Sequence, residues 1–217
     1  MSRPAAAGGR WVAVAPERLA QWLDGFAERH GAIRWSADES RVRVVAEDGA
    51  LAELLVPFPP LRVDADAPFG GLIAHTCAPR TVGVLLVRLG GFACGVFEDT
   101  RLLESKAGSR PVHGRAAAGG WSQQRFARRR EGQAQVALQA AADAAARVLL
   151  PAVDRLDAVV AGGDRGAVDA VLADTRLAPL RALLDPSLLD VPTPNRRVLI
   201  DAPARFRAVS IRVVDPE

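Results

Sequence analysis

The sequence predicts an α+β protein in which helices pack on a mixed β-sheet, preceded by a smaller lobe. Two observations lead to this fold class. Short apolar runs typical of strands occur in two groups in the first half of the chain, and helical and strand patterns alternate in the second half. The apolar fraction of 49% over 217 residues supplies a substantial core. We expect an N-terminal α+β lobe over residues 1–70 and a larger domain over residues 71–217.

The N-terminal lobe is expected to consist of one helix and a small antiparallel meander. The helix begins at Pro16, a favoured first helical position, and ends at Gly31, with apolar residues along one face. Strand-like runs follow at residues 32–36, 41–47 and 51–58. The prolines of "VPFPP" and the polar stretch "DADAPFGG" mark the boundary near residue 70.

The larger domain is expected to begin with a second meander of buried strands and to continue with helices. Between residues 108 and 124 the sequence has no period, and a gap of this length inside a compact domain calls for a functional explanation. The expected elements are strands at 81–89, 92–98 and 101–107, a long helix at 125–150, a strand at 156–163, helices at 164–174 and 177–184, and a closing strand at 206–214.

Positive charge is concentrated in one short stretch. Residues 110–130 hold six arginines and no acidic residue, whereas the formal charge of the whole chain is only +3. The N-terminus has no signal-peptide pattern and "VGVLLV", the longest strongly apolar run, is too short to span a bilayer, so we expect a cytoplasmic protein. Cys77 and Cys94 fit a reducing compartment, and Cys94 lies in an apolar strand pattern typical of the core.

The stretch "AAAGGWSQQRFARRR" combines a glycine pair, a glutamine pair and arginines. Gly119 and Gly120 allow a close backbone approach to another molecule, and Gln123 can position a water while backbone N–H groups stabilise an oxyanion. Three arginines at i, i+3 and i+4 of the following helix can bind phosphates: Arg125, Arg128 and Arg129. Taken alone, the glycines fit a plain hinge before a helix and the arginines a solvated face.

Gly120, Trp121, Ser122 and Gln123 give the pattern G-x-x-Q, and with Gly119 and "QRFARRR" this stretch resembles the catalytic loop of the Vms-like release factors, actinobacterial branch. That family is related to the middle domain of archaeal and eukaryotic class-1 release factors, whose loop ends in Gly-Gly-Gln. The resemblance covers about residues 75–217. It implies a domain resembling the ribonuclease H fold and a site that cleaves peptidyl-tRNA on stalled large ribosomal subunits.

By this resemblance Gln123, Gly120 and Gly119 are the catalytic residues, and Arg125, Arg128, Arg129 and Arg115 bind rRNA or the tRNA acceptor end. We expect no cofactor, no metal and no membrane partner. Trp121 and Ser122 separate the glycines from Gln123, unlike the uninterrupted Gly-Gly-Gln, so two other outcomes stay open: cleavage of the tRNA at its 3′ CCA end, and a non-catalytic module that binds ribosomal RNA. Oligomeric state is not readable from the sequence.

Other short motifs have simpler interpretations. "VVAGGDRG" follows a strand and precedes a helix, but its spacing departs from nucleotide fingerprints, and we expect an ordinary turn capped by Asp164. His75 and Cys77 form an H-x-C pair without a second pair to complete a metal site. His113 is a lone histidine upstream of the glycines. Glu98 and its neighbour Asp99 are expected to be turn residues.

Overall fold

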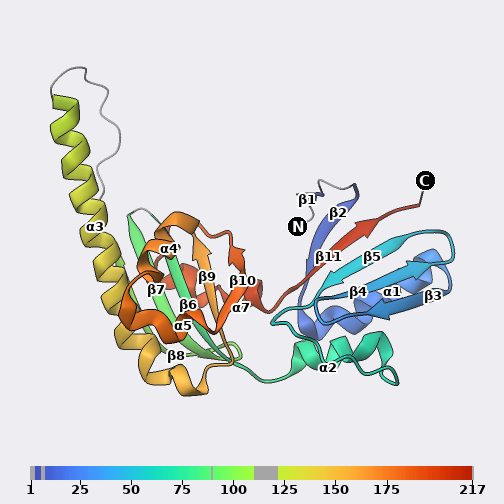
Figure 1. Cartoon of the computed structure of the whole chain (residues 1–217). Helices are drawn as coiled ribbons and strands as arrows, with labels where there is room; N and C mark the ends of the chain where they lie inside the picture. The colour runs from blue at the N-terminus through green and yellow to red at the C-terminus, as the bar shows by residue number, and fades with distance from the viewer. Residues whose placement is uncertain (1–2, 6–7, 89, 110–121, 217) are drawn as a thin grey trace. The chain divides into compact units, whose positions relative to one another are not determined.

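The computed structural model describes residues 3–5, 8–88, 90–109 and 122–216, with Arg3 and residues 122–131 described by their backbone alone. The chain forms two compact units, and each has its own β-sheet (Figure 1). The first unit contains Met1–Ala78 together with Ala204–Glu217, and the second contains Pro79–Pro203. The predicted α+β class, with helices packed on a mixed sheet, is confirmed.

The first unit is built on an antiparallel six-stranded sheet with the order β1-β2-β11-β5-β4-β3. Strand β4 alternates strictly between exposed and buried residues, so one face of the sheet is buried and the other is exposed to solvent. The strands are β1 (Arg3–Pro4), β2 (Arg10–Val14), β3 (Ile33–Ala37), β4 (Arg41–Ala46), β5 (Leu51–Leu55) and β11 (Val209–Val214).

The buried face of this sheet packs against α1 (Leu19–His30) and α2 (Leu72–Cys77). Short 3-10 helices precede them, η1 (Pro16–Arg18) and η2 (Pro68–Gly71). The apolar stripe expected on the first helix is in place, because Leu19, Leu23 and Phe26 are fully buried in the core. Gly31 ends α1 with a φ of 85°, a conformation that favours glycine.

The second unit is built on a mixed five-stranded sheet with the order β10-β9-β6-β7-β8. Strands β10, β9 and β6 run parallel, and β6, β7 and β8 form the antiparallel meander that the sequence predicted. The central strands are buried almost throughout, because helices cover both faces of the sheet. The strands are β6 (Thr81–Arg88), β7 (Gly91–Glu98), β8 (Arg101–Ser109), β9 (Ala158–Gly163) and β10 (Leu184–Leu189).

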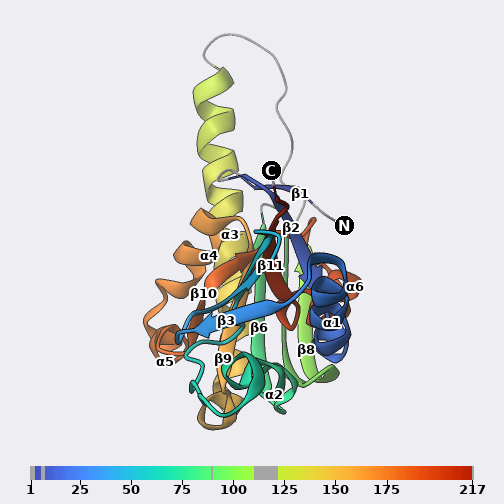
Figure 2. The same ribbon diagram turned by 90° about the vertical axis from the view of Figure 1, so that its right-hand side faces the viewer.

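One face of this sheet carries α3, α4 and α5, and α6 contacts β7 and β8 on the other face. The longest element is α3, whose N-terminal half extends past the sheet while its C-terminal half packs on β7 and β8 (Figure 1; Figure 2 gives a second view). The helices of this unit are α3 (Ser122–Leu149), η3 (Leu150–Arg155), α4 (Arg165–Leu172), η4 (Thr175–Leu177), α5 (Ala178–Arg181) and α6 (Arg196–Ile200). Helix α7 (Pro203–Phe206) begins at the last residue of this unit and continues into the first.

Two expectations about domain organisation are corrected. The units divide at Ala78 and Pro79, not near residue 70, because α2 packs on the first sheet. The closing strand does not join the second domain, since β11 returns to the first unit and pairs between β2 and β5. Three strands of the described chain were not predicted: β1, β2 and β10. Pro186 is tolerated in β10 because this strand lies at the edge of its sheet.

One segment of the described chain, Gly132–Arg155, is long and apolar enough to cross a membrane by length and composition. The fold accounts for this composition differently. The apolar residues on one side of α3, Ala141, Ala145 and Val148 among them, are buried against the sheet. The segment therefore has the character of a core helix.

The pairing of β11 leads to a prediction about the first unit. Ile211 is fully buried between Val12 and Leu54 on the neighbouring strands. Ile211→Ala should lower the free energy of unfolding of this unit by about 2–5 kcal/mol, the range for truncating a large buried aliphatic side chain. Denaturant titration followed by tryptophan fluorescence measures this loss.

The matched control is the exposed neighbour on the same strand, Ser210. Ser210→Ala should change the free energy of unfolding by about 0.5 kcal/mol or less. Equal losses in the two variants would show that β11 is not a central strand.

Candidate functional site

The sequence-predicted site lies between the end of β8 at Ser109 and the start of α3 at Ser122. Three of its predicted residues, Arg115, Gly119 and Gly120, lie outside the described residues, as do His113 and Trp121. The described part of the site is therefore the backbone at the beginning of α3.

Gln123 lies in the first turn of α3. The sequence predicted that the helix begins at Arg125 and leaves both glutamines in the loop, but α3 begins at Ser122. The physical reason is that glutamine has nearly the same helix propensity as arginine, so the helix extends back toward the glycines. Successive helical residues are turned by about 100° around the axis, so positions 123 and 124 lie on different sides of the helix.

The predicted phosphate-binding arginines also belong to α3. Arg125, Arg128 and Arg129 fall within its first turns, and their spacing of three and four residues places the three positions on one side of the helix. Arg130 is turned by a further 100° or so and lies on a different side. No acidic residue occurs in the first turn, so positive charge coincides with the positive end of the helix dipole.

The position of these residues depends on how the other half of α3 is held. Small side chains on one side of the helix let it pack closely on the sheet, and Ala141, Ala144 and Ala145 are all buried there. Val148 and Leu149 complete the contact with β7. From Leu138, which is partly buried at the edge of this core, the helix continues for 16 residues to Ser122, a length of roughly 24 Å.

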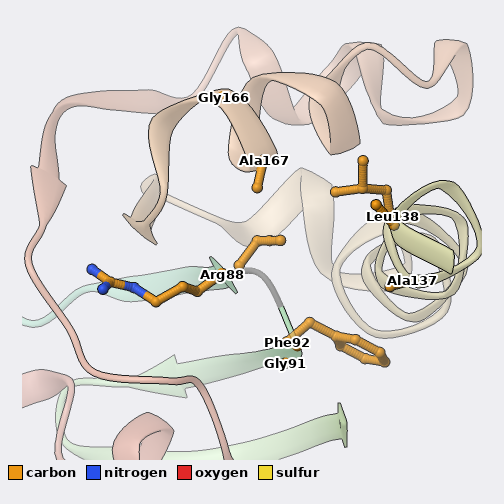
Figure 3. A pocket seen from close by; sticks show the side chains of 10 residues that line it. Arg88, Gly91, Phe92, Ala137, Leu138, Gly166 and Ala167 are labelled. Carbon is orange, nitrogen blue, oxygen red and sulfur yellow. The ribbon is translucent and has the colours of Figure 1, made fainter. Parts of the chain in front are cut away.

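A cavity of about 230 Å³ lies where α3 leaves the sheet, and Figure 3 shows its lining. Its walls are apolar and come from Phe92, Leu138 and Ala167 among others. The guanidinium of Arg88 extends away from Leu138 and Ala167, toward Asp190 at 3.6 Å. The described lining of this cavity therefore offers no polar group arranged for catalysis.

The glycine-rich turn after β9 is a structural turn, as the sequence predicted. The Oδ1 of Asp164 accepts a hydrogen bond from the backbone N–H of Ala167 at 2.8 Å and caps α4. Gly163 has a φ of 105°, and a Cβ atom at this position would lie 2.1 Å from the carbonyl oxygen of Val87. Glycine is required here because two backbone segments approach closely.

The remaining short motifs take structural roles in the described chain. Burial raises the pKa of the Cys94 thiol to about 12, so this thiol stays protonated and serves as a core residue. The Nε2 atom of His75 lies 2.9 Å from the carbonyl oxygen of Pro57, and no group of three metal-ligating side chains occurs among the described residues. Asp99 lies in the turn after β7 and accepts a hydrogen bond from the backbone N–H of Arg80, and Glu98 pairs with Arg101.

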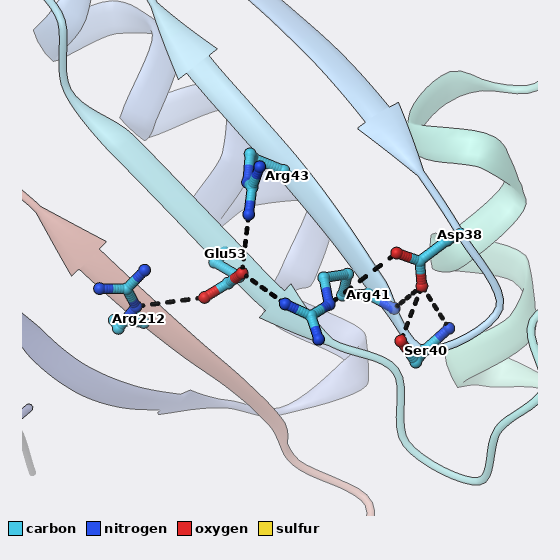
Figure 4. A network of polar contacts seen from close by, with 6 residues as sticks. All are labelled: Asp38, Ser40, Arg41, Arg43, Glu53 and Arg212. Carbon is cyan, nitrogen blue, oxygen red and sulfur yellow. Dashed lines mark hydrogen bonds and ion pairs between the residues drawn. The ribbon is translucent and has the colours of Figure 1, made fainter. Parts of the chain in front are cut away.

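Sequence analysis missed one polar network, in the first unit (Figure 4). The side chain of Glu53 is only 10% exposed and accepts hydrogen bonds from Arg41 at 3.1 Å, Arg43 at 3.3 Å and Arg212 at 3.1 Å. Burial alone would raise the pKa of Glu53, but the bonds from Arg43 and Arg212, with the charge of Arg212, outweigh it and hold the pKa below its usual value. The signal in the sequence was a single acid in the apolar run "LAELLV" beside the alternating "RVRVV".

Comparison with known proteins identifies the family to which this chain belongs. No curated protein sequence matches the chain. Two solved structures have a TM-score of 0.39 each: an archaeal translation termination factor, aRF1, at 14% identity, and an archaeal protein at 15% identity. The alignments cover 91% and 75% of this chain but only 66% and 51% of those two chains. The model of the Actinobacteria/chloroflexi VLRF1 release factor family matches residues 80–212, more than half of the sequence and the whole of α3, and the chain therefore belongs to that family.

Proposed function

We propose that this protein is a ribosome-associated peptidyl-tRNA hydrolase that releases nascent chains from stalled large ribosomal subunits. The observation that carries the proposal is the family match over residues 80–212, which includes the predicted catalytic segment and the helix that follows it. Membership of a release-factor family supports a role in translation at the ribosome. The hydrolysis itself and the substrate are our inference from Gln123 and its surroundings.

The geometry of α3 supports this proposal. A group that acts inside the ribosome must stand well clear of the body of its protein, because the reaction centre is enclosed by RNA. Gln123 lies in the first turn of a helix whose N-terminal half extends past its sheet (Figure 1). The packed alanine face fixes the direction of the helix from the opposite end.

Gln123 would act by orientation and not as a base, because an amide does not take up a proton at neutral pH. It would hold the attacking water, or the ester, while backbone N–H groups stabilise the negative charge that develops on the carbonyl oxygen. The first N–H groups of an α-helix have no partner inside the helix, so the start of α3 supplies such donors. No metal is required by this scheme.

The arginines at the start of α3 would anchor this end on RNA. Arg125, Arg128 and Arg129 occupy positions on one side of the helix, and guanidinium groups bind phosphates with two parallel hydrogen bonds. Arg115 belongs to the same proposed set on sequence grounds alone. The expected partners are therefore the large subunit, its rRNA and peptidyl-tRNA, and the expected place of action is the cytoplasm.

One observation favours a second candidate reaction. Trp121 and Ser122 separate the glycine pair from Gln123, so the spacing differs from the uninterrupted Gly-Gly-Gln of class-1 release factors. Cleavage of the tRNA at its CCA end, with a ribose 2′-OH as the nucleophile, would use the same anchoring arginines. The two reactions leave different tRNA products.

The first functional prediction concerns Gln123. Gln123→Ala should reduce peptide release from large subunits that carry peptidyl-tRNA by about 100-fold, the scale for removing one oriented oxyanion or water contact. Binding to the subunits should stay unchanged, because the arginines remain. Release of a labelled peptide at saturating protein concentration measures the effect.

The control is Gln124→Ala, which changes the adjacent residue on a different side of the same helical turn. Its activity should stay within about threefold of the unaltered protein, since surface substitutions away from a site have small effects. A dispensable Gln123 beside an essential Gln124 would contradict the proposed register.

The second functional prediction concerns the arginines. Replacing Arg125, Arg128 or Arg129 with alanine should weaken binding to large subunits, and each lost phosphate contact should reduce the log–log salt slope by about 0.7 to 0.9. Arg130→Ala should have a smaller effect, because position 130 lies on a different side of the helix. Sedimentation binding over a range of KCl concentrations gives both quantities.

The matched control is Arg155→Ala, an exposed arginine just beyond the opposite end of α3. Arg181 is unsuitable as a control, because its Nη1 donates a hydrogen bond to the carbonyl oxygen of Leu172 at 2.7 Å. If Arg155→Ala weakened binding as much as Arg128→Ala, with unaltered salt slopes, the arginines of α3 would act only through net charge and the anchoring proposal would fail.

A further inference from the structure

The solvent-facing side of the first unit's sheet carries a cluster of arginines. Cross-strand register places Ser36, Arg43, Glu53 and Arg212 in one row across β3, β4, β5 and β11. Arg41 lies two residues before Arg43 on β4 and therefore on the same face. Helices α1 and α2 pack on the opposite face. We call this set of residues, together with Arg34, the arginine face.

The arginine face has more positive charge than its one buried acid neutralises. Glu53 is the common acceptor for three guanidinium groups, and Asp38 makes a second ion pair with Arg41 (Figure 4). With Arg34 the face holds four arginines against these two carboxylates, so a positive excess remains. Arg34 lies opposite Val45 on the same face and makes no ion pair with any residue in the described part of the chain. The first unit as a whole has nearly equal numbers of acidic and basic residues, so the charge is segregated and not merely abundant.

The arginines are held in place and remain accessible. The side chains of Arg41 and Arg43 are 48% and 50% exposed, and each guanidinium has five N–H donors of which Glu53 occupies only a part. A polar hollow of about 250 Å³ lies beside them, lined by Ser36, Asp38 and both arginines. The Oδ1 atom of Asp38 accepts hydrogen bonds in the β3–β4 turn from Ser40 and from the backbone N–H of Arg41. Its Oδ2 atom lies 3.8 Å from Nε of Arg41, a second ion pair of this guanidinium.

We propose that the arginine face is a docking surface for the phosphate backbone of RNA. Fixed guanidinium groups around a polar hollow match phosphate oxygens in geometry and charge, and an open antiparallel sheet offers a broad, shallow surface. The choice of RNA as the polyanion rests on the proposed function, which places the chain on the ribosome. The arginine face belongs to the first unit and α3 to the second, so the chain would contact RNA through both units.

The test is binding of the full chain to a fluorescein-labelled RNA duplex of roughly 20 base pairs, followed by anisotropy between about 50 and 200 mM KCl. Such a duplex has no CCA end and no ester, so the result is independent of the proposed reaction. The measurement is made in the unaltered chain and again with Arg125, Arg128 and Arg129 replaced by alanine. The second background removes the contribution of α3.

In both backgrounds Arg43→Ala and Arg34→Ala should each weaken binding by about two- to fivefold and reduce the salt slope by about 0.7 to 0.9. Arg34→Ala removes no described ion pair, so its effect cannot be attributed to loss of folding. The matched control is Arg29→Ala, which makes the same charge change on α1, at the opposite face of the sheet, and should leave affinity unchanged. Losses in Arg29→Ala equal to those in Arg43→Ala and Arg34→Ala would overturn the proposal, as would unchanged binding in both variants of the arginine face.

Discussion

The packing of one half of α3 on the β7–β8 hairpin is the contact on which the rest of the second unit depends. Alanines bring the helix close to the sheet, and Val148 and Leu149 close the contact at its C-terminal end. Because an α-helix is stiff over this length, fixing one half also fixes the direction of the other. The first turn, with Gln123, is therefore held away from the sheet without needing contacts of its own.

The two units differ in how much of each sheet is covered by helices. In the second unit helices cover both faces of the sheet, and the proposed site lies on α3, whose N-terminal half extends past the sheet. In the first unit helices pack on one face, and the other is held together by cross-strand ion pairs around Glu53. Removing any of these arginines would leave a mostly buried carboxylate with fewer donors, so the network is both a structural and a charged feature.

Most of the strands and both long helices could be predicted, because a residue's immediate neighbours decide whether an apolar pattern has a period of 2 or 3.6. The partner of a strand is decided elsewhere in the chain. Arg212 meets Glu53 across a separation of 159 residues, and nothing near either residue indicates that β11 returns to the first sheet. The proposed site residues rest on a short motif and stay a prediction. The exact start of α3 was missed, since helix ends depend on small differences in propensity.

The fate of the tRNA tests the central claim most directly. Large subunits carrying peptidyl-tRNA are incubated with the protein, and the tRNA is then separated on a denaturing gel that resolves loss of the CCA end. We predict full-length deacylated tRNA, whose appearance depends on Gln123. Shortened tRNA would show cleavage of a phosphodiester in place of the ester. Peptidyl-tRNA that stays intact while the protein is bound would contradict a catalytic role for the residues at the start of α3.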